Sequence, residues 1–432
     1  MSNLKPTKPM SGMVELLPPA QRCFDECARR MMAVLETAGF NKLDLPLLER
    51  AEVLVDTDNW DDIATEIYLF QKGDTKMGLR YDGTVGLARY VAKNMSELAF
   101  PFRSYMFGKN YRGERPQRGR YREFYQLDLD VFGIGGLSKN YDAEIVAILS
   151  NMYESVREFI GPTNILVGSR TFWNAMFEYL ELDAETSRAA FILIDKKDKL
   201  GDEFEPALRT KIGDKTDVIL SVFSDGYRAM LNKSDSLGIA VRELDDFVAQ
   251  LGVMGIKNAT IDLSIMRGHG YYTGIVFEFQ LDNFKELGFV GGGGRYENLC
   301  AKFSKTSIVG VGAAVGFSRI LVALMDDGKI DLSSFESNTD VCVLTMGSEN
   351  VAYAMGITSS LRDAGIVTVP YLDADKKFKN QMEFADKIGC KFSVIIGEDE
   401  VKDKVVSIKN MTTGEQQKLT LEDAIDIVNR KS

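Results

Sequence analysis

The sequence predicts an α+β protein whose main domain is built on an antiparallel sheet and whose C-terminal end forms a separate α/β domain. Strand-like segments of alternating polarity occur before and after a central stretch of helical periodicity. After about residue 338 the pattern becomes a regular alternation of strands and helices. At 432 residues the chain is longer than one hydrophobic core usually supports, so two or three domains are expected.

The N-terminal part predicts a long helix, several short strands and a second helix. Apolar residues at helical spacing and a closing glycine indicate a helix from Pro18 to Gly39. The second helix is predicted over 84–94, with Thr84 as its N-cap. Between the helices lie strand-like segments at 40–49, 67–71 and 76–82, the last two joined by a turn.

Two longer strands follow, with a basic loop between them. Segments 103–113 and 122–133 are predicted to be neighbours in an antiparallel sheet. Because side chains alternate between the two faces of a strand, Gln126, Asp128 and Asp130 are expected on one face.

The central stretch, 163–258, is predicted to be a mostly helical insertion that carries none of the chemistry-rich motifs. Sheet pattern resumes at 259–281 and 287–299, and a final helix starts near Gly316. The expected domains are a discontinuous main domain (1–162 and 259–325), the insertion, a linker (326–337) and a small, mostly parallel α/β domain (338–432).

The charge of the chain is acidic overall but basic in one place. The formal net charge is -11 with a pI near 5.0, which argues against a general nucleic-acid coat, because non-specific binding needs a broadly basic face. Arginines and aromatic residues are nevertheless interleaved between positions 103 and 125. Arginine forks suit phosphate or carboxylate, and aromatic rings offer stacking surfaces, so a local site for a phosphate and a flat ring is expected.

The cysteine and histidine content excludes several kinds of chemistry. The five cysteines are scattered without CxxC spacing, which favours reduced thiols over disulfides or a zinc site. The single histidine, His269, excludes a Ser-His-Asp arrangement and the HExxH metal motif, so no metal site of cysteine or histidine is expected. The sequence has no signal peptide and no apolar run long enough to span a membrane, which predicts a cytoplasmic protein.

Several segments together resemble the histidyl-tRNA synthetases, a family of class II aminoacyl-tRNA synthetases, over nearly the whole chain. GFNKLDLPLLE, YRGERPQRGRYREFYQLDLDVFG and GVGAAVGFSRI are similar to the three class II motifs in order, and LRYDGTVGLARY, RGHGYYTG and GGGGRYE to family-specific segments. The resemblance implies a six-stranded class II antiparallel sheet flanked by helices, a helical insertion, a C-terminal anticodon-binding domain and a homodimer. It implies ATP and Mg²⁺ with L-histidine and tRNA(His) as partners.

The resemblance also implies roles for individual residues. For ATP, Arg112 would hold the α-phosphate and Arg319 the γ-phosphate, while Glu114 and Phe124 would contact adenine. Arg267 would bridge the histidine carboxylate and the α-phosphate, and with Arg112 it is the expected catalytic residue. The expected histidine-binding residues are Asp82, Thr84, Arg112, Gln126, Asp130, Arg267, Tyr271 and Tyr272, and the residues expected at the tRNA acceptor end are Arg115, Arg118 and Arg120.

The sequence departs from the family pattern at three places. His269 and Gly270 stand where the family has Leu and Asp, Ser318 replaces an acidic residue before Arg319, and Asp82 replaces Glu. These changes leave an alternative open: a paralogue that binds histidine as a regulatory subunit of histidine biosynthesis. A plain RNA-binding protein is a third interpretation, but it does not explain the Gly-rich and Arg-Tyr-Tyr segments.

Overall fold

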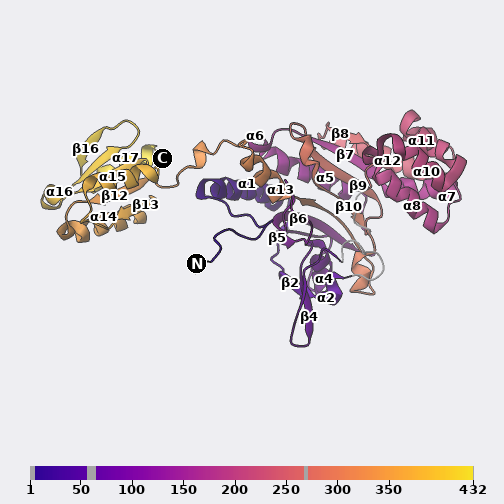
Figure 1. Cartoon of the computed structure of the whole chain (residues 1–432), viewed down its shortest axis with the longest axis horizontal. Helices are drawn as coiled ribbons and strands as arrows, with labels where there is room; N and C mark the ends of the chain where they lie inside the picture. Colours follow the sequence, from indigo (N-terminus) through magenta and orange to yellow (C-terminus); the bar gives the residue numbers. More distant parts are fainter. Residues whose placement is uncertain (1–4, 56–64, 267–270, 432) are drawn as a thin grey trace. The chain divides into compact units, whose positions relative to one another are not determined.

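The computed structural model describes residues 5–55, 65–266 and 271–431 (Figure 1). The chain divides into two compact units, one of Met1–Glu15 and Asp25–Ile330 and the other of Leu16–Phe24 and Asp331–Ser432. The break after Ile330 falls inside the predicted linker, 326–337.

The first unit is built on a mixed sheet that has eight strands in the described part of the chain. Six consecutive strands of this sheet, from β5 to β7, are antiparallel, while β1 and β8 pair in parallel at the two edges. The predicted antiparallel sheet is confirmed. Its order is β1 (Asn41–Lys42), β5 (Phe102–Tyr111), β6 (Glu123–Ile134), β11 (Ile308–Val315), β10 (Phe289–Tyr296), β9 (Ile275–Leu281), β7 (Thr163–Ser169) and β8 (Ala259–Ile261).

One boundary of the predicted insertion differs from the structure. Strand β7, which lies inside the predicted range 163–258, pairs with β9 along its whole length and belongs to the main sheet. Periodicity in a short segment does not reveal strand pairing with a segment a hundred residues away, which is why the sequence did not separate β7 from the helices. The helical part begins at Arg170.

Helices cover both faces of the sheet. Helix α4 (Thr84–Asn94) shares a buried core with Met106, Phe132, Val276 and Tyr296 from four strands. Helices α5 (Asn140–Glu154) and α13 (Phe317–Asp326) pack against β11 and β6. The other helices before β7 are α1 (Pro18–Thr37), α2 (Ala51–Leu54) and α6 (Arg157–Ile160).

The N-cap predicted for α4 is wrong. Thr84 is the first helical residue, and the N-cap position, Gly83, has no side chain. The carboxylate of Asp82 instead accepts a hydrogen bond from the amide of Val85 at 3.1 Å. An aspartate one residue further upstream therefore satisfies a donor of the first turn.

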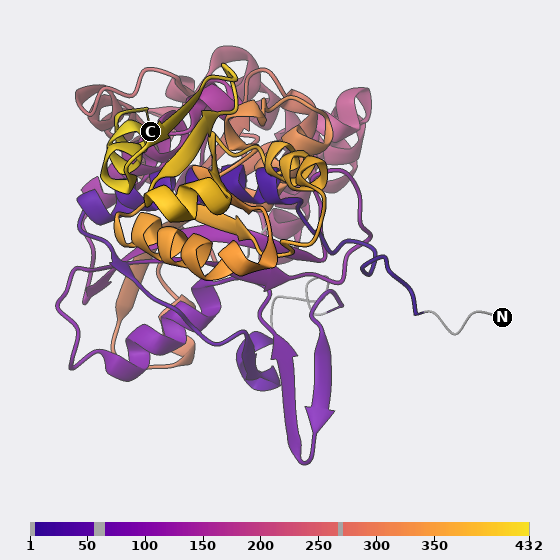
Figure 2. The same ribbon diagram turned by 90° about the vertical axis from the view of Figure 1, so that its left-hand side faces the viewer.

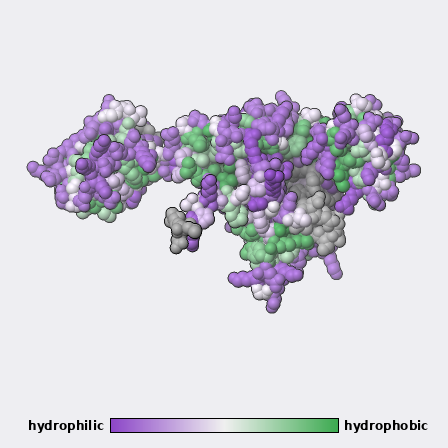
Figure 3. Space-filling model, viewed as in Figure 1, coloured by the Kyte–Doolittle hydropathy of each residue, from purple (hydrophilic) through white to green (hydrophobic). Residues whose placement is uncertain are grey.

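A small three-stranded sheet projects from the first unit. It consists of β2 (Leu48–Arg50), β4 (Thr75–Leu79) and β3 (Leu69–Lys72), and its β3–β4 hairpin is visible in Figure 2. Figure 3 shows apolar surface over the base of this hairpin. The exposed apolar side chains there are Leu47, Leu48, Leu69 and Phe70.

The helical part of the first unit follows β7. Its long helix α12 (Asp235–Val253) packs against α5 and α7, which attaches this part to the sheet layer. The other helices are α7 (Arg170–Tyr179), α8 (Ala184–Asp195), α9 (Lys197–Leu200), α10 (Phe204–Ile212) and α11 (Thr216–Asp225).

The second unit is an α/β domain around a five-stranded sheet of order β13-β12-β14-β15-β16 within the described residues. Strands β13, β12 and β14 are parallel, and β15 and β16 continue the sheet antiparallel, so the predicted alternation holds for the first three strands. The strands are β12 (Val341–Thr345), β13 (Thr368–Tyr371), β14 (Phe392–Ile396), β15 (Val406–Asn410) and β16 (Gln416–Leu419), and the helices α14 (Val351–Asp363), α15 (Phe378–Lys387), α16 (Glu398–Asp403) and α17 (Leu421–Lys431).

All five cysteines are buried in the two cores. Among the helices of residues 5–55, 65–266 and 271–431, none is long and apolar enough to cross a membrane.

Candidate active site

Two adjoining cavities open on the face of the sheet that carries Gln126, Asp128 and Asp130. The first has a volume of about 280 Å³ and is lined by arginines and aromatic rings. The second has a volume of about 140 Å³ and is lined by carboxylates and tyrosines. They share four residues, namely Arg112, Gln126, Gly316 and Arg319. The site can therefore hold an anionic group with a ring on one side and a cationic group on the other.

Arg112 lies at the end of β5, between two aromatic rings. Its guanidinium carbon is 4.2 Å from the ring centroid of Tyr81 and 5.2 Å from that of Phe124. Its Nε is buried and has no hydrogen-bond partner among the described residues. A buried unpaired donor held in place by two rings is suited to bind an anionic ligand.

Arg319, in the first turn of α13, also lines both cavities. Its Nη2 donates to the carbonyl of Leu287 at 2.6 Å, while its buried Nε has no partner within the described chain. Burial lowers the pKa of Arg319, because desolvation penalises the charged guanidinium. An incoming anion would offset that desolvation.

The basic loop between β5 and β6 forms the wall of the first cavity. Glu114 and Arg120 both line it and are joined by an ion pair of 3.1 Å. Arg118 is exposed and forms ion pairs with Asp327 and Glu286 instead of lining the cavity. Arg115 is exposed.

The second cavity is acidic. Asp82, Asp128 and Asp130 line it, and they are only 9%, 3% and 1% exposed. In each of them one carboxylate oxygen, Oδ2, is buried without a hydrogen-bond partner in the described residues. Buried carboxylates left unpaired in this way require a donor or a cation from a ligand.

Asp130 is held in place from two sides. Its Oδ1 accepts a hydrogen bond from the hydroxyl of Tyr296 at 2.6 Å. A Cβ at Gly312, on the neighbouring strand, would stand 1.9 Å from the same oxygen, so only glycine leaves room for the carboxylate. Burial raises the pKa of Asp130 to about 7, against the opposing effect of the Tyr296 hydrogen bond.

Tyrosine rings complete the second cavity. The ring of Tyr271 packs on Tyr272, with 4.7 Å between centroids, and edge-on against Tyr296 at 5.8 Å. Gln126 is oriented by the side chain of Asn110, whose Nδ2 donates to its Oε1. The pocket thus combines fixed acceptors with hydroxyl groups around a space of amino-acid size.

The comparisons with known proteins agree with this geometry. A family model described as "Histidyl-tRNA synthetase" matches residues 12–324, and one described as "Anticodon binding domain" matches residues 340–431. The chain belongs to the histidyl-tRNA synthetase family. A histidine–tRNA ligase of Clostridium tetani is 35% identical over 434 residues, which cover 97% of each chain, and one of Finegoldia magna is 35% identical over 433 residues, covering 96% of this chain and 98% of the relative.

A solved structure leads to the same family. The crystal structure of histidyl-tRNA synthetase from Nostoc sp. PCC 7120 has a TM-score of 0.83 and 28% sequence identity, and all of each chain is covered. The class II fold and the C-terminal anticodon-binding domain expected from the sequence are therefore confirmed.

Most residues predicted for this family's site lie together. The predicted residues that line one or both cavities are Asp82, Thr84, Arg112, Glu114, Arg120, Phe124, Gln126, Asp130, Tyr271, Tyr272 and Arg319. Arg115 and Arg118 do not line either cavity. Arg267, His269 and Gly270 lie outside the described residues.

The sequence did not single out two residues of the acidic cavity. Tyr296, the partner of Asp130, comes soon after the Gly-rich run, and the sequence predicted a role only for the glycines of that segment. Asp128 was placed on the correct face by alternation, but no role was given to it. The signal that could have found Asp128 was its position between Gln126 and Asp130 on that face.

Ser318 stands where the family usually has an acidic residue, and the structure shows what it contacts. Its Oγ accepts a hydrogen bond from the amide of Tyr125 at 2.9 Å. The pairing of β6 with β11 ends at Leu127 and Val315. The amide of Tyr125 is the next one on the β11 side of β6, and Ser318 gives it an acceptor where β11 no longer does. In this chain the position therefore joins α13 to the sheet.

Proposed function

We propose that this protein is a histidine–tRNA ligase, which activates L-histidine with ATP to histidyl-adenylate and transfers it to the 3′ end of tRNA(His). The observation that carries the proposal is the meeting of a cationic, aromatic cavity and an acidic, tyrosine-lined cavity at Arg112 and Arg319. The reaction joins the carboxylate of one substrate to the α-phosphate of the other, and these two arginines lie where the substrates would meet.

In the activation step a carboxylate oxygen of histidine forms a bond to the α-phosphorus and pyrophosphate leaves with its electron pair. The carboxylate is already ionised at neutral pH, so no protein base is required. Catalysis then depends on in-line positioning and on stabilising charge at the phosphorus. Arg112 would supply a fixed guanidinium there, Arg319 would bind the outer phosphates, and Arg267 keeps the bridging role that the resemblance gives it.

Selection of histidine would come from the acidic cavity. Asp130, fixed by Tyr296, would accept a hydrogen bond from one imidazole nitrogen, and Tyr272 would pair with the other. Asp82, Thr84 and Gln126 would bind the α-amino group. An amino acid without ring nitrogens leaves these buried groups unpaired, which is a strong penalty against wrong substrates.

Mg²⁺ is proposed to enter with ATP. In the described part of the chain, no group of three or more His, Cys, Asp or Glu side chains could hold a metal ion. The site therefore suits an ion that takes most of its ligands from phosphate oxygens and water, as Mg²⁺ usually does in nucleotide sites. Glu114 and Glu278, which both interact electrostatically with Arg319, supply carboxylate oxygens of the type that Mg²⁺ prefers, and the bound ion would offset phosphate charge.

Two macromolecular contacts belong to the proposal. The tRNA acceptor end would contact the basic loop, where Arg115 is exposed, and the anticodon would bind the C-terminal domain. A second copy of the chain would cover the exposed Leu47, Leu48, Leu69 and Phe70, consistent with a homodimer.

The deciding experiment is histidine-dependent exchange of pyrophosphate into ATP by the purified protein with Mg²⁺. We expect exchange that requires L-histidine and that falls by at least a hundredfold in the Arg112→Ala variant. No exchange above background, together with measurable histidine binding, would instead favour the regulatory paralogue. A plain RNA-binding protein would neither exchange pyrophosphate nor bind histidine.

A further inference from the structure

Asp128 is the carboxylate of the acidic cavity that has no assigned role. It is 3% exposed, and its Oδ2 has no hydrogen-bond partner among residues 5–55, 65–266 and 271–431. It lines the same 140 Å³ cavity as Asp82 and Asp130. A charged group buried to this degree and left unpaired points to a ligand that supplies the missing donor.

The position of Asp128 shows which end of the cavity it serves. Asp130 and Gln126 flank it on β6, and the opposite residues are Met106 on β5 and Ala314 on β11. A Cβ placed on Gly83 would stand 2.5 Å from its Oδ2, so the carboxylate lies against the backbone between Asp82 and Thr84. Asp130, by contrast, lies over Gly312 of β11 and is bonded to Tyr296. Asp128 therefore turns toward the start of α4, away from the Tyr296 side.

A structural role as counter-ion to Arg80 is the simplest alternative. Arg80 is buried close to Asp128 and interacts with it electrostatically. Its Nε and Nη1, however, donate to the carbonyls of Lys109 and Leu45 at 2.8 and 2.9 Å, and Nη1 also contacts the sulfur of Met106. Two of its three nitrogens are thus bonded to carbonyls and not to a carboxylate, and Asp128 keeps its unpaired oxygen.

We propose that Asp128 is a further specificity-determining residue, which accepts a hydrogen bond from the α-ammonium group of the bound amino acid together with Asp82. An ammonium group has three N–H donors, and the unpaired Oδ2 atoms of Asp82 and Asp128 at the start of α4 provide acceptors for two of them. The inference rests on the proposed function, because it takes the substrate to be an α-amino acid.

The charges around Asp128 favour a cationic ligand. Burial, Asp130 and Asp82 raise the pKa of Asp128 well above its usual range, and Arg80 and Arg112 oppose this only partly. Tyr271, Tyr272, Tyr296 and Arg319 also line this cavity, and Tyr296 is bonded to Asp130. A bound ammonium group favours the ionised carboxylate, so a cationic ligand group suits this position better than an uncharged group does.

The test compares two ligands by calorimetry in the full-length protein without ATP or tRNA. L-Histidine carries the α-ammonium group, and 3-(imidazol-4-yl)propionate lacks it but keeps the ring and the carboxylate. In the Asp128→Asn variant we expect the Kd of histidine to rise about 10- to 100-fold, as for a lost hydrogen bond to a charged group, and that of the propionate to change less than about twofold. Unchanged histidine affinity, or equal weakening of both ligands, would overturn the proposal.

Two controls keep the result interpretable. The Asp198→Asn variant makes the same substitution at an exposed site in the helical part and should bind both ligands like the parent protein. If Asp128→Asn does not fold, the Asp128→Ser variant, which also removes the carboxylate, is compared with the parent protein on the same two ligands. A selective loss of histidine affinity supports the proposal, and an equal loss for both ligands, or no loss, overturns it. Both readouts are binding measurements, so failure of pyrophosphate exchange would refute the proposed function and not this inference.

Discussion

Two clusters of buried charge lie in the main sheet, and they differ in how completely their polar atoms are bonded. The first is the ion pair of Arg295, in β10, with Asp142, in α5; both residues are 2% exposed. The second is the group of three aspartates, Asp82, Asp128 and Asp130, each with one unpaired oxygen among the described residues. Burial is similar in the two clusters, so burial alone does not mark a functional site.

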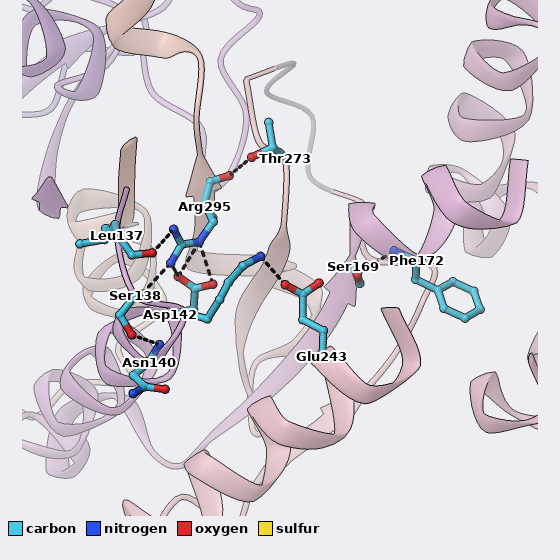
Figure 4. Close-up of polar contacts among 10 residues, drawn as sticks. Leu137, Ser138, Asn140, Asp142, Ser169, Phe172, Glu243, Thr273 and Arg295 are labelled. Atoms are coloured by element: carbon cyan, nitrogen blue, oxygen red, sulfur yellow. Dashed lines mark hydrogen bonds and ion pairs between the residues drawn. The ribbon is translucent and has the colours of Figure 1, made fainter. Parts of the chain in front are cut away.

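Every guanidinium nitrogen of Arg295 is bonded, and Figure 4 shows these contacts. Its Nε and Nη2 donate to the Asp142 carboxylate at 2.7 to 3.1 Å, and Nη1 and Nη2 donate to the carbonyls of Leu137 and Ser138 at 2.9 and 2.8 Å. The backbone carbonyl of Arg295 accepts from the amide of Thr273 at 2.8 Å. These bonds fix β10 to the segment before α5 and to the chain just after Tyr271 and Tyr272.

The difference in bonding indicates that the Arg295 cluster is structural and that the three aspartates bind a ligand. A buried ion pair in which every guanidinium nitrogen is bonded leaves little for a ligand, whereas three carboxylates with unpaired oxygens lower stability until a ligand binds. The first cluster should therefore respond to mutation with a loss of stability, and the second with a gain in stability and a loss of binding.

The largest effect is expected at Asp142. Replacing it with Asn removes the charge that compensates Arg295 but keeps the size of the side chain, and a broken buried ion pair typically costs about 3–5 kcal/mol. We expect a decrease of this order in the free energy of unfolding, measured by urea denaturation. Asp217→Asn is the matched control, because 67% of the Asp217 side chain is exposed and its surface ion pair with Arg209 should be worth about 0–1 kcal/mol. Equal losses in the free energy of unfolding at the two sites would contradict the prediction that the buried, bonded ion pair is structural.

The opposite sign is expected at Asp130. Its pKa is about 7 in the folded protein and 3.8 is usual, so the folded state favours the neutral carboxyl. The stabilising contribution is complete below pH 4 and is lost as the pH rises through 7. Asp130→Asn cannot ionise, so it should be more stable than the parent protein at pH 8 by about 1–3 kcal/mol, with little difference near pH 4.

Two measurements check this prediction. Thermal unfolding across pH 4–8 should show the gap in stability opening as the pH rises, and calorimetry at pH 8 should show weaker histidine binding. A variant that is less stable at pH 8 would show that Asp130 is bonded for structure, like Asp142.

Much of the fold could be predicted because its signals are local. Alternation along 122–133 placed Asp128 and Asp130 on one face, and the basic loop lay where the cavity wall is found. Strand β7 was missed because its place in the sheet depends on pairing with β9, far away in sequence. The N-cap of α4 was misassigned because Asp82 and Thr84 are both good capping residues, and only the backbone at Gly83 decides between them.

The residues that line the two cavities could be predicted one by one only where a motif existed. Arg112 and Arg319 belong to such motifs and line both cavities. The bond between Tyr296 and Asp130 joins two strands separated in the sheet by β11, and no local pattern reports it. The unpaired oxygen of Asp128 is likewise a property of the packed structure.

A smaller effect is expected at Ser318, which tests whether this departure from the family is structural. Ser318→Ala leaves the amide of Tyr125 without its acceptor and should lower the free energy of unfolding by about 1 kcal/mol. The affinity for histidine should stay within about twofold of that of the parent protein, since the hydroxyl is already engaged with β6. A large loss of affinity with unchanged stability would instead place Ser318 in the binding site.

The smallest effect is expected at Thr84, where stability separates the two capping assignments. If Thr84 were the N-cap of α4, replacing it with Ala would cost about 1–2 kcal/mol. Because it is the first helical residue, and Asp82 accepts the hydrogen bond from Val85, we expect Thr84→Ala to change the free energy of unfolding by less than about 0.5 kcal/mol. Urea denaturation resolves the two values. A cost above 1 kcal/mol would show that the Thr84 hydroxyl, and not the carboxylate of Asp82, stabilises the first turn, and would leave both oxygens of Asp82 available to the ligand.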